Sequence, residues 1–417
     1  MKYKNFDEWF SDFNSSKRYK ANYQGKDLRP LRVKFAINLL PELSYLNTVK
    51  KIHVTGSSGK SSCSKIWGEF LYHNGFSAGV ITKPHVCKYN ERYWFNGDLA
   101  DDKTILPIFE KVMKINEQVG ANSNYGSLRY VEAMFIVGLL YFSKMKLDYL
   151  VIEAGIGALY DYTNVFEQWE VGVITSVHNE HRRRLGGSID SIIGHKVAIA
   201  NKSKRAYVLE KSLTMQKSIV SKIHKDVEIL KLNNSFEVRN RQVYIMDNGI
   251  LEKKIPLNTN LVSDGHLVDL ASVVHFVNSK IKVNDEISYN IKLLGRLDTK
   301  EFNDKLLVFD TAHTPESVAG VINTVNKIYP STSKYLFLAV TGKKKGKRMI
   351  ELIKSNVNKI YTVRLKIKGV PFNYYSNLGE QEIDINEILS EIDKLPKDSI
   401  IIFTGSIYYV GYVMGIF

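Results

Sequence analysis

The stretch VTGSSGKSSC, residues 54–63, decides how this chain is interpreted. Its glycines, serines and lysine are typical of a phosphate-binding loop, but only two serines separate Gly56 from the Gly59-Lys60 pair. The usual phosphate loop has four residues in that gap, and its first glycine would fall on Val54. The question is therefore whether the shortened loop still binds a nucleotide, and for which reaction.

The segments on either side of the loop support a nucleotide site. KKIHVTG (50–56) is typical of a buried strand, and SSCSKIWGEFLYHNG (61–75) is typical of a helix that ends at an Asn-Gly pair. A loop that opens a helix presents backbone N–H groups to phosphate oxygens. Lys60 would reach the phosphates, and Ser61 or Ser62 would offer a hydroxyl to phosphate or Mg²⁺. A Gly/Ser turn before a capped helix is the alternative.

Length and composition indicate a globular protein of two or three domains, because the chain has 417 residues, of which 44% are hydrophobic and 24% charged. The start of the chain, MKYKNFDEWFSDFN, is not a secretory signal. Two cysteines, Cys63 and Cys87, fit a reducing compartment, so we expect a cytoplasmic protein with no membrane span. The net charge of +15 favours anionic partners, although lysine-rich solvated faces, such as TGKKKGKR (341–348), give the same balance.

Alternating strands and helices predict an α/β fold with mostly parallel sheets. Short apolar runs typical of strands occur at 77–82, 147–153 and 171–176, and again at 306–310, 335–340, 359–363 and 399–404, with helices expected at 128–145 and 265–279. Between 225 and 265, the runs VEILKL, FEVRN and VYIMDNGILEKKIPL predict short antiparallel strands around a turn. We place a domain boundary near 290, which gives domains 1–290 and 291–417.

Two acidic residues lie where strands end. Glu153 ends a strand in VIEAGIGALYDYTNV (151–165), and Asp310 ends another in LLVFDTAHTPESV (306–318), three residues before His313. Ligand residues of α/β sheets occupy this edge, so Glu153 is a candidate Mg²⁺ ligand. A local hydrogen-bonding role at the strand end or helix start is the alternative for both acids.

A third candidate segment is ITSVHNEHRRRLGGSIDSIIGHKVAIA (174–200). His178 and His181 could form a zinc pair, but no cysteine is near, so a histidine and a carboxylate sharing Mg²⁺ with phosphate is favoured. Lys196 lies on an otherwise apolar helix. It either extends to solvent or lies in a functional pocket.

Taken in order, these stretches resemble the Mur ligase superfamily, and within it the folylpolyglutamate synthase and dihydrofolate synthase branch. The resemblance runs from about residue 30 to the C-terminus and rests on eight ordered blocks. They are HVTGSSGKSS, AGVITKPHVCKYNERYWFNG, YVEAMFIVGLLYF, DYLVIEAGIGALYDYTNV, VITSVHNEH…LGGSI…HKVAIA, LLGRLD, FDTAHTPESV and FTGSIYYVGYV. The short loop spacing is the spacing of this family.

The resemblance implies an N-terminal P-loop ATPase domain and a smaller C-terminal Rossmann-like domain. It implies an ATP-dependent ligase that joins an amino acid, expected to be glutamate, to a folate-like or other carboxylate through an acyl phosphate, with release of ADP and phosphate. The implied cofactors are ATP and one or two Mg²⁺. The partners are then small molecules, without membrane or nucleic acid, and the protein is a monomer or weak oligomer.

The resemblance also assigns roles by position. The ATP loop comprises Gly56, Ser57, Ser58, Gly59, Lys60, Ser61 and Ser62, and the nucleotide contacts of the second domain are Arg296 and Asp310. The metal ligands are Ser62, Glu153, His181 and Lys196, the last as a carbamate that supports a second Mg²⁺. The catalytic residues are Lys60, Lys196, His181 and His313.

Several positions depart from the family pattern. Lys83 replaces a serine of the first magnesium site. Glu180-His181-Arg182-Arg183 stands where the family has Asp-His-Thr-Asp, so that three arginines, Arg182–Arg184, are consecutive. Leu267 and Leu270 replace amides of the helix that helps to hold adenine. The alternatives to a ligase are therefore a P-loop kinase or nucleotide-dependent regulator, and a catalytically altered nucleotide-binding protein or partner subunit in a specialised pathway.

Overall fold

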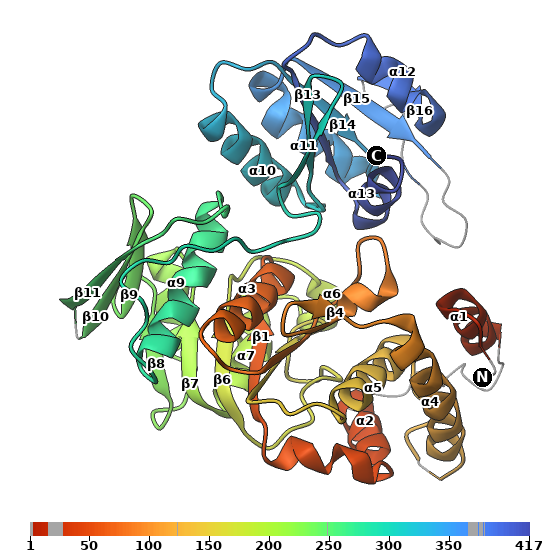
Figure 1. Ribbon diagram of the computed structural model, residues 1–417, viewed down its shortest axis with the longest axis vertical. Coiled ribbons are helices and arrows are strands. Elements are labelled where there is room, and N and C mark those ends of the chain that lie inside the picture. The colour runs from red at the N-terminus through yellow and green to blue at the C-terminus, as the bar shows by residue number, and fades with distance from the viewer. Residues whose placement is uncertain are drawn as a thin grey trace. The chain divides into compact units, whose positions relative to one another are not determined.

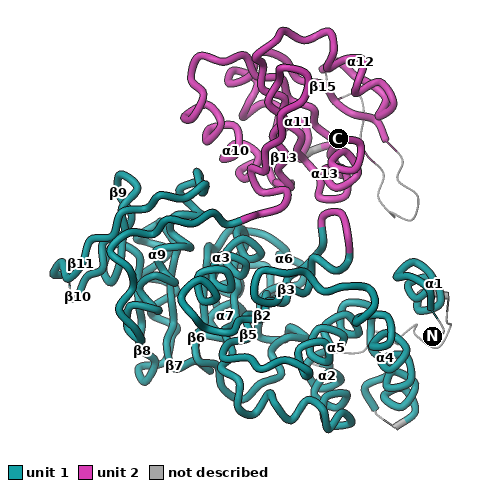
Figure 2. Tube along the Cα trace, viewed as in Figure 1, with its two compact units in different colours: residues 1–85, 89–291 teal, residues 86–88, 292–417 magenta. Residues whose placement is uncertain are grey.

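The computed structural model describes residues 3–15, 28–122, 124–247, 249–365, 374, 378 and 380–417. The chain forms two compact units (Figure 2). Unit 1 contains residues 1–85 and 89–291, and unit 2 contains residues 86–88 and 292–417. Among the described residues, no helix is both long enough and apolar enough to cross a membrane.

Unit 1 is built on an eight-stranded sheet in the order β4-β3-β2-β5-β1-β6-β7-β8. The six strands from β2 to β8 in this order run parallel, and β3 and β4 extend the edge in antiparallel fashion. The strands are β1 Lys50–Thr55, β2 Ala78–Ile81, β3 Tyr93–Phe95, β4 Asp98–Leu99, β5 Tyr149–Glu153, β6 Trp169–Ile174, β7 Ser203–Val208 and β8 Glu228–Lys231. The predicted mostly parallel sheet is confirmed, with the glycine loop after its central strand β1.

The helices of unit 1 lie around this sheet and against one another (Figure 1). They are α1 Phe6–Ser15, α2 Leu28–Asn38, α3 Lys60–His73, α4 Asp102–Asn122, α5 Tyr130–Phe142, α6 Arg182–Leu185, α7 Ile189–Ala200, α8 Leu213–Val220 and α9 Asp264–Asn278, with 3₁₀ turns at Pro41–Asn47 and Tyr89–Arg92. Helix α3 packs against α9, where Leu267 and Leu270 are buried. Helix α5 is apolar on all sides because it is enclosed by the core.

One strand prediction is wrong in its pairing. The run VEILKL contains β8, which pairs parallel to β7 in the large sheet rather than with the antiparallel strands after it. Helix α8 joins β7 to β8, and a crossover through a helix returns the chain in the parallel direction. The other two runs form the predicted antiparallel sheet, with strands β9 Phe236–Arg239, β10 Gln242–Asp247 and β11 Ile250–Pro256.

Unit 2 has a six-stranded sheet in the order β12-β13-β17-β14-β15-β16, in which β12 is antiparallel to β13 and the other pairs are parallel. Its strands are β12 Asp298–Phe302, β13 Lys305–Phe309, β14 Lys334–Leu338, β15 Lys359–Arg364, β16 Gln381–Asp384 and β17 Ile400–Thr404. Its helices are α10 Pro315–Ile328, α11 Lys343–Ile353, α12 Ile388–Asp393 and α13 Ile407–Met414, with 3₁₀ turns at Lys354–Asn356 and Ile385–Glu387. This is the α/β architecture expected of the smaller domain.

Candidate active site

The glycine loop connects β1 to α3 and depends on two glycines. Gly56 has φ +155°, and a Cβ added there would lie 1.9 Å from Oγ1 of Thr175. Gly59 has φ +81° and caps the N-terminus of α3. The left-handed region disfavours other residues, and the close approach to Thr175 excludes any side chain at Gly56. The loop can take this shape only with glycine at both positions.

The loop is fixed to the segment that follows β6. The Ser57 amide donates to the Ser176 carbonyl at 2.8 Å, and the Ser58 amide donates to Oγ of Ser176 at 3.1 Å. In return, Oγ1 of Thr175 donates to the Ser58 carbonyl at 2.6 Å, and the His178 amide donates to Oγ of Ser57 at 2.8 Å. The loop is therefore ordered by neighbouring backbone and hydroxyl groups.

Two side chains at the start of α3 have the positions that phosphate chemistry needs. The Lys60 ammonium donates to the carbonyls of Gly56 at 2.9 Å and Ser57 at 3.3 Å, so it folds back over the loop. Oγ of Ser61 donates to Oε2 of Glu153 at 2.9 Å. A lysine over the loop and a hydroxyl next to a carboxylate are the groups that phosphate and Mg²⁺ bind.

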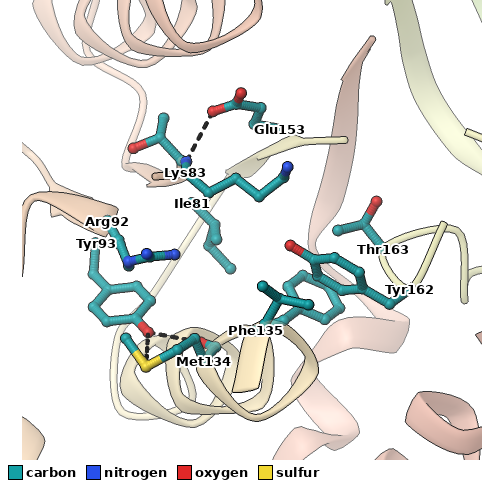
Figure 3. A pocket seen from close by; sticks show the side chains of 11 residues that line it. Ile81, Lys83, Arg92, Tyr93, Met134, Phe135, Glu153, Tyr162 and Thr163 are labelled. Carbon is teal, nitrogen blue, oxygen red and sulfur yellow. Dashed lines mark hydrogen bonds between the residues drawn. The ribbon is translucent and has the colours of Figure 1, made fainter. Parts of the chain in front are cut away.

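Glu153 lies at the carboxyl end of β5 and is 3% exposed. Its Oε2 also accepts a hydrogen bond from the Lys83 amide at 2.9 Å (Figure 3). The hydroxyl that bonds Glu153 belongs to Ser61, whereas the Ser62 side chain is buried. Ser61 is therefore better placed than Ser62 to share a metal with Glu153, although Ser62 is the serine assigned by the resemblance.

A buried carboxylate that sequence analysis missed organises the Gly-x-Gly turn after β5. Asp161 accepts hydrogen bonds from the amides of Gly155 at 2.9 Å and Ile156 at 3.0 Å, and from Oγ1 of Thr163 at 2.6 Å. Oγ1 of Thr163 in turn lies 2.8 Å from Nε2 of His53. Burial would raise the pKa of Asp161, but the Lys83 ammonium and these hydrogen bonds outweigh it, so the pKa lies below its usual range. Asp161 is therefore an ionised anchor for the turn.

Replacing Asp161 with Asn should destabilise the protein by about 2–3 kcal/mol at pH 7, because hydrogen bonds to a buried charged group are lost or weakened. A carboxylate with a lowered folded-state pKa contributes stability above its unfolded value, near about 3.9, and this contribution is lost as the pH falls through the folded value. The difference in the free energy of unfolding between variant and wild type, measured with urea, should therefore be smaller at pH 3 than at pH 7. An equal difference at both pH values would contradict the ionised anchor.

Lys196, Glu180 and His181 form a charged cluster with Lys60. Lys196 is 1% exposed, and its Nζ lies 3.5 Å from Oε1 of Glu180. Burial lowers the pKa of Lys196 to about 7, Lys60 lowers it further, and Glu180 opposes the shift. Partial burial also lowers the pKa of His181, which Glu180 opposes and the cations Lys60, Arg184 and Lys196 reinforce. Lys196 is thus buried rather than extended to solvent, while Arg182–Arg184 are exposed.

The predicted residues of unit 2 gather at the end of β13. Asp310 accepts hydrogen bonds from the amides of Leu297 at 2.9 Å and Ala312 at 2.8 Å, and it is 6% exposed. Burial raises its pKa, although Arg296 and these hydrogen bonds oppose the shift. Nδ1 of His313 lies 3.1 Å from the Thr311 carbonyl, and the His313 side chain is exposed. Asp310 therefore joins the Arg296 loop to the His313 loop within unit 2.

The comparisons with known proteins agree with this geometry. No family model matches the chain. The dihydrofolate synthase/folylpolyglutamate synthase of Buchnera aphidicola subsp. Schizaphis graminum is 26% identical and aligns over 97% of this chain and 96% of its own. The chain is therefore similar to dihydrofolate synthase/folylpolyglutamate synthases over nearly its whole length. The protein of the same name from Bacillus subtilis is 32% identical over 152 residues, which are 36% of this chain and 35% of its own.

Solved structures of folylpolyglutamate synthases share the fold of this chain. A bifunctional folylpolyglutamate synthase/dihydrofolate synthase with Mn, AMPPNP and L-glutamate bound has a TM-score of 0.77 at 20% identity and covers 93% of both chains. E. coli FolC in complex with DHPP and ADP has a TM-score of 0.78 at 20% identity and covers 98% of this chain and 97% of its own. The predicted resemblance and the predicted two-domain α/β fold are confirmed.

The oxygen donors beside the glycine loop of this chain fit one magnesium ion. Across the described residues, no three His, Cys, Asp or Glu side chains come together as a metal-binding group. The Glu153 carboxylate and the Ser61 hydroxyl are hard oxygen donors, and Mg²⁺ is often held by one carboxylate together with substrate phosphates. An unmodified Lys196 has no lone pair to offer when charged, so a second ion there requires its carbamate.

Proposed function

We propose that this chain is an ATP-dependent ligase that joins glutamate to a folate-like carboxylic acid and releases ADP and phosphate. The observation that carries the proposal is the short glycine loop, with Lys60 folded over it and Ser61 bonded to the strand-end Glu153. The names of the relatives, dihydrofolate synthase/folylpolyglutamate synthase, support this substrate class. The nucleotides and glutamate bound in the solved structures support ATP and an amino acid as co-substrates.

The reaction joins two unreactive groups by way of an activated acid. A carboxylate oxygen attacks the γ-phosphorus of ATP and ADP leaves, which gives an acyl phosphate. The amine nitrogen then attacks the acyl carbon, phosphate leaves, and the amine loses a proton as the amide forms. Both steps place negative charge on phosphate oxygens, so the protein must supply fixed positive groups.

Each part of the loop has a role in this scheme. The amides at the N-terminus of α3 orient the phosphates, since those of Ser57 and Ser58 already donate to Ser176. Lys60 neutralises charge on the γ-phosphate. Glu153 and Ser61 would hold Mg²⁺, which supplies charge neutralisation to the phosphates when bound. His181 and a carbamylated Lys196 would hold a second ion, with Ser62 a further hydroxyl in α3.

Residues of unit 2 are proposed to complete the ligand contacts. Arg296 and Asp310 are assigned to the nucleotide, and His313 to the amino acid. Their position at the carboxyl end of β13 supports this, because ligands of α/β sheets bind at that edge. We also propose that the protein acts in the cytoplasm as a monomer or weak oligomer, which agrees with the two free cysteines.

The proposal is tested by incubating the protein with ATP, L-glutamate and either tetrahydrofolate or dihydropteroate. The release of ADP measures turnover. Hydroxylamine added in place of glutamate should trap the acyl phosphate as an acyl hydroxamate. A phosphorylated product without amide would indicate a kinase. Nucleotide binding without turnover, for every acid tried, would indicate a catalytically altered binding protein.

Lys196 should react with CO₂ to form a carbamate, because the pKa of about 7 leaves a large fraction of the amine neutral near pH 7. The nitrogen attacks CO₂ and one proton is released, so the carbamate should increase as the pH rises from 6 to 8. Burial lowers the pKa of Lys196 most, Lys60 lowers it further and Glu180 opposes the shift. The measurement is ¹³C NMR of protein equilibrated with ¹³C-bicarbonate, with Lys196→Arg as the control. A wild-type spectrum that matches the control at pH 8 would refute the modification.

A further inference from the structure

A small pocket is lined in part by Glu153 (Figure 3). Its walls are polar and charged at Lys83, Arg92 and Thr163, and apolar at Ile81, Phe135 and Tyr162. All of its lining residues belong to unit 1. The cavity volume is about 10 Å³, which is about the room that one water molecule needs. The pocket can therefore take one oxygen-sized group, whereas a ring has to lie outside it.

Arg92 is a buried cation without an acidic partner. It is 6% exposed and comes from the 3₁₀ turn before β3. Its Nε donates to Nδ1 of His85 at 3.0 Å, and its guanidinium lies 5.7 Å from the ring of Tyr130. Burial, followed by Arg92 itself, lowers the pKa of His85 to about 3, so the histidine is neutral and leaves the arginine charge uncompensated. In the described part of the chain, no carboxylate lies within ion-pair distance of Arg92.

Aromatic packing encloses Arg92 from the other side. The ring of Tyr130 meets the ring of Phe10 from α1 at 4.9 Å, and Phe6 of the same helix lies against Tyr89 at 4.4 Å. The Tyr130 ring beside the guanidinium is thus held by α1, and Arg92 is largely shielded from solvent. A buried charge without a partner is costly, so an anion bound beside Arg92 would offset that cost.

Lys83 brings a second cation to the same pocket. Its backbone amide is fixed by Glu153, while its ammonium makes no hydrogen bond or ion pair with any residue that the structure describes. Figure 3 shows the Lys83 chain crossing the top of the pocket, with the Arg92 guanidinium and the Tyr162 hydroxyl both directed into it. Glu153 and Asp161 attract the Lys83 ammonium, whereas Lys60 and Arg92 repel it. An anion between Lys83 and Arg92 would relieve this repulsion.

We propose that Lys83 and Arg92 form an anion subsite that holds one oxygen of the carboxylate that becomes phosphorylated. The inference rests on the proposed ligase function and names the residues that bind its acceptor acid. Glu153 borders both this pocket and Ser61 of the loop, so an acid held here lies next to the nucleotide site. The size of the cavity admits one carboxylate oxygen and leaves the other free to attack phosphorus. The apolar wall formed by Ile81, Phe135 and Tyr162 suits the carbon skeleton of an aromatic acid.

The subsite is tested with Arg92→Gln and Lys83→Met, which remove charge and keep much of the side-chain length. Charged hydrogen bonds contribute about 1.5–3 kcal/mol each, so the KM for the acceptor acid should rise about 10- to 100-fold in either variant. The KM for ATP should change less than about twofold, because Ser61 of the loop reaches only the backbone carbonyl of Lys83, at 3.4 Å, which both substitutions retain. Lys103→Gln removes an exposed lysine of α4 and should match the wild type. Arg92→Lys should recover part of the loss.

A binding experiment separates a charge contact from a structural role. Benzoate and benzamide have nearly the same shape but differ in charge, and titration calorimetry in the presence of ADP measures each. Wild type should prefer benzoate, and Arg92→Gln should lose that preference. If Arg92→Gln does not fold, Lys83→Met decides, since Lys83 is partly exposed.

The two proposals fail in different ways. Benzoate selectivity that depends on Arg92, in a protein that ligates no acid, would retain the subsite and refute the ligase. Ligase activity with an unchanged acceptor KM and unchanged benzoate preference in both variants would overturn the subsite and retain the ligase. A wild type that does not distinguish benzoate from benzamide would also overturn the subsite.

Discussion

Lys60→Ala should lower the rate of ATP turnover by about 10³-fold, because one fixed positive group at the developing phosphate charge typically contributes this much. The ammonium is within 2.9 Å of the Gly56 carbonyl, so it is already positioned over the loop that would hold the phosphates. The measurement is ADP release with saturating acid and glutamate. Circular dichroism and thermal unfolding should show an intact fold, since Lys60 bonds only carbonyls of its own loop.

Lys114→Ala is the matched control for this experiment. Lys114 is an exposed lysine on α4 of the same unit, so its removal changes the net charge equally without touching the loop. Its turnover should equal that of the wild type. Full activity in Lys60→Ala would remove the argument that the loop binds ATP for catalysis.

Gly56→Ala should lower turnover about 100-fold and destabilise the protein by about 1–3 kcal/mol. The added Cβ would lie 1.9 Å from Oγ1 of Thr175, so either the loop or β6 must move. Displacing the loop misplaces the phosphates relative to Lys60 and Glu153. Chemical unfolding and steady-state kinetics measure the two effects separately.

Two further variants test the cause of this effect. In Gly56→Ala with Thr175→Ala, the hydroxyl is gone and the nearest remaining contact is 3.1 Å, so part of the stability should return. Gly194→Ala adds the same methyl group to helix α7, where nothing lies within 4 Å, and should be neutral or stabilising by up to about 1 kcal/mol. If both single glycine variants behaved alike, the steric argument would be wrong.

Local pattern is sufficient for most of the fold because each element has its own periodicity and boundary signals. The strand before Gly56 and the helix that ends at Asn74 were identifiable from apolar residues bounded by glycine. The pairing of strands depends on the segments that connect them, such as α8 between β7 and β8, and not on the local sequence pattern. For this reason β8 was assigned to the wrong sheet, although it was recognised as a strand.

The candidate site divides in the same way. Glu153 and Lys196 stand out because a charged residue interrupts an apolar element. Asp161 and Arg92 do not, since their importance comes from partners brought together by folding, such as the Gly155 amide and His85. Which serine bonds Glu153 depends on how α3 is rotated about its axis. The spacing of the sequence alone does not decide between Ser61 and Ser62. The sequence shows Lys83 as a departure from the family pattern. Only the pocket shows that a second cation, Arg92, lies near it.

The bracing of the glycine loop by Ser176 and His178 has a thermodynamic consequence. Flexible segments lose conformational entropy when a ligand orders them, and that loss weakens binding. Here the amides of Ser57 and Ser58 are already fixed by hydrogen bonds to Ser176, in the segment that follows β6. The loop therefore has little backbone freedom left to lose when phosphates arrive. The affinity for a nucleotide is then set by its contacts with the loop and not by the cost of ordering the loop. A substitution at Ser176 or His178 would change nucleotide binding by changing the rigidity of the loop.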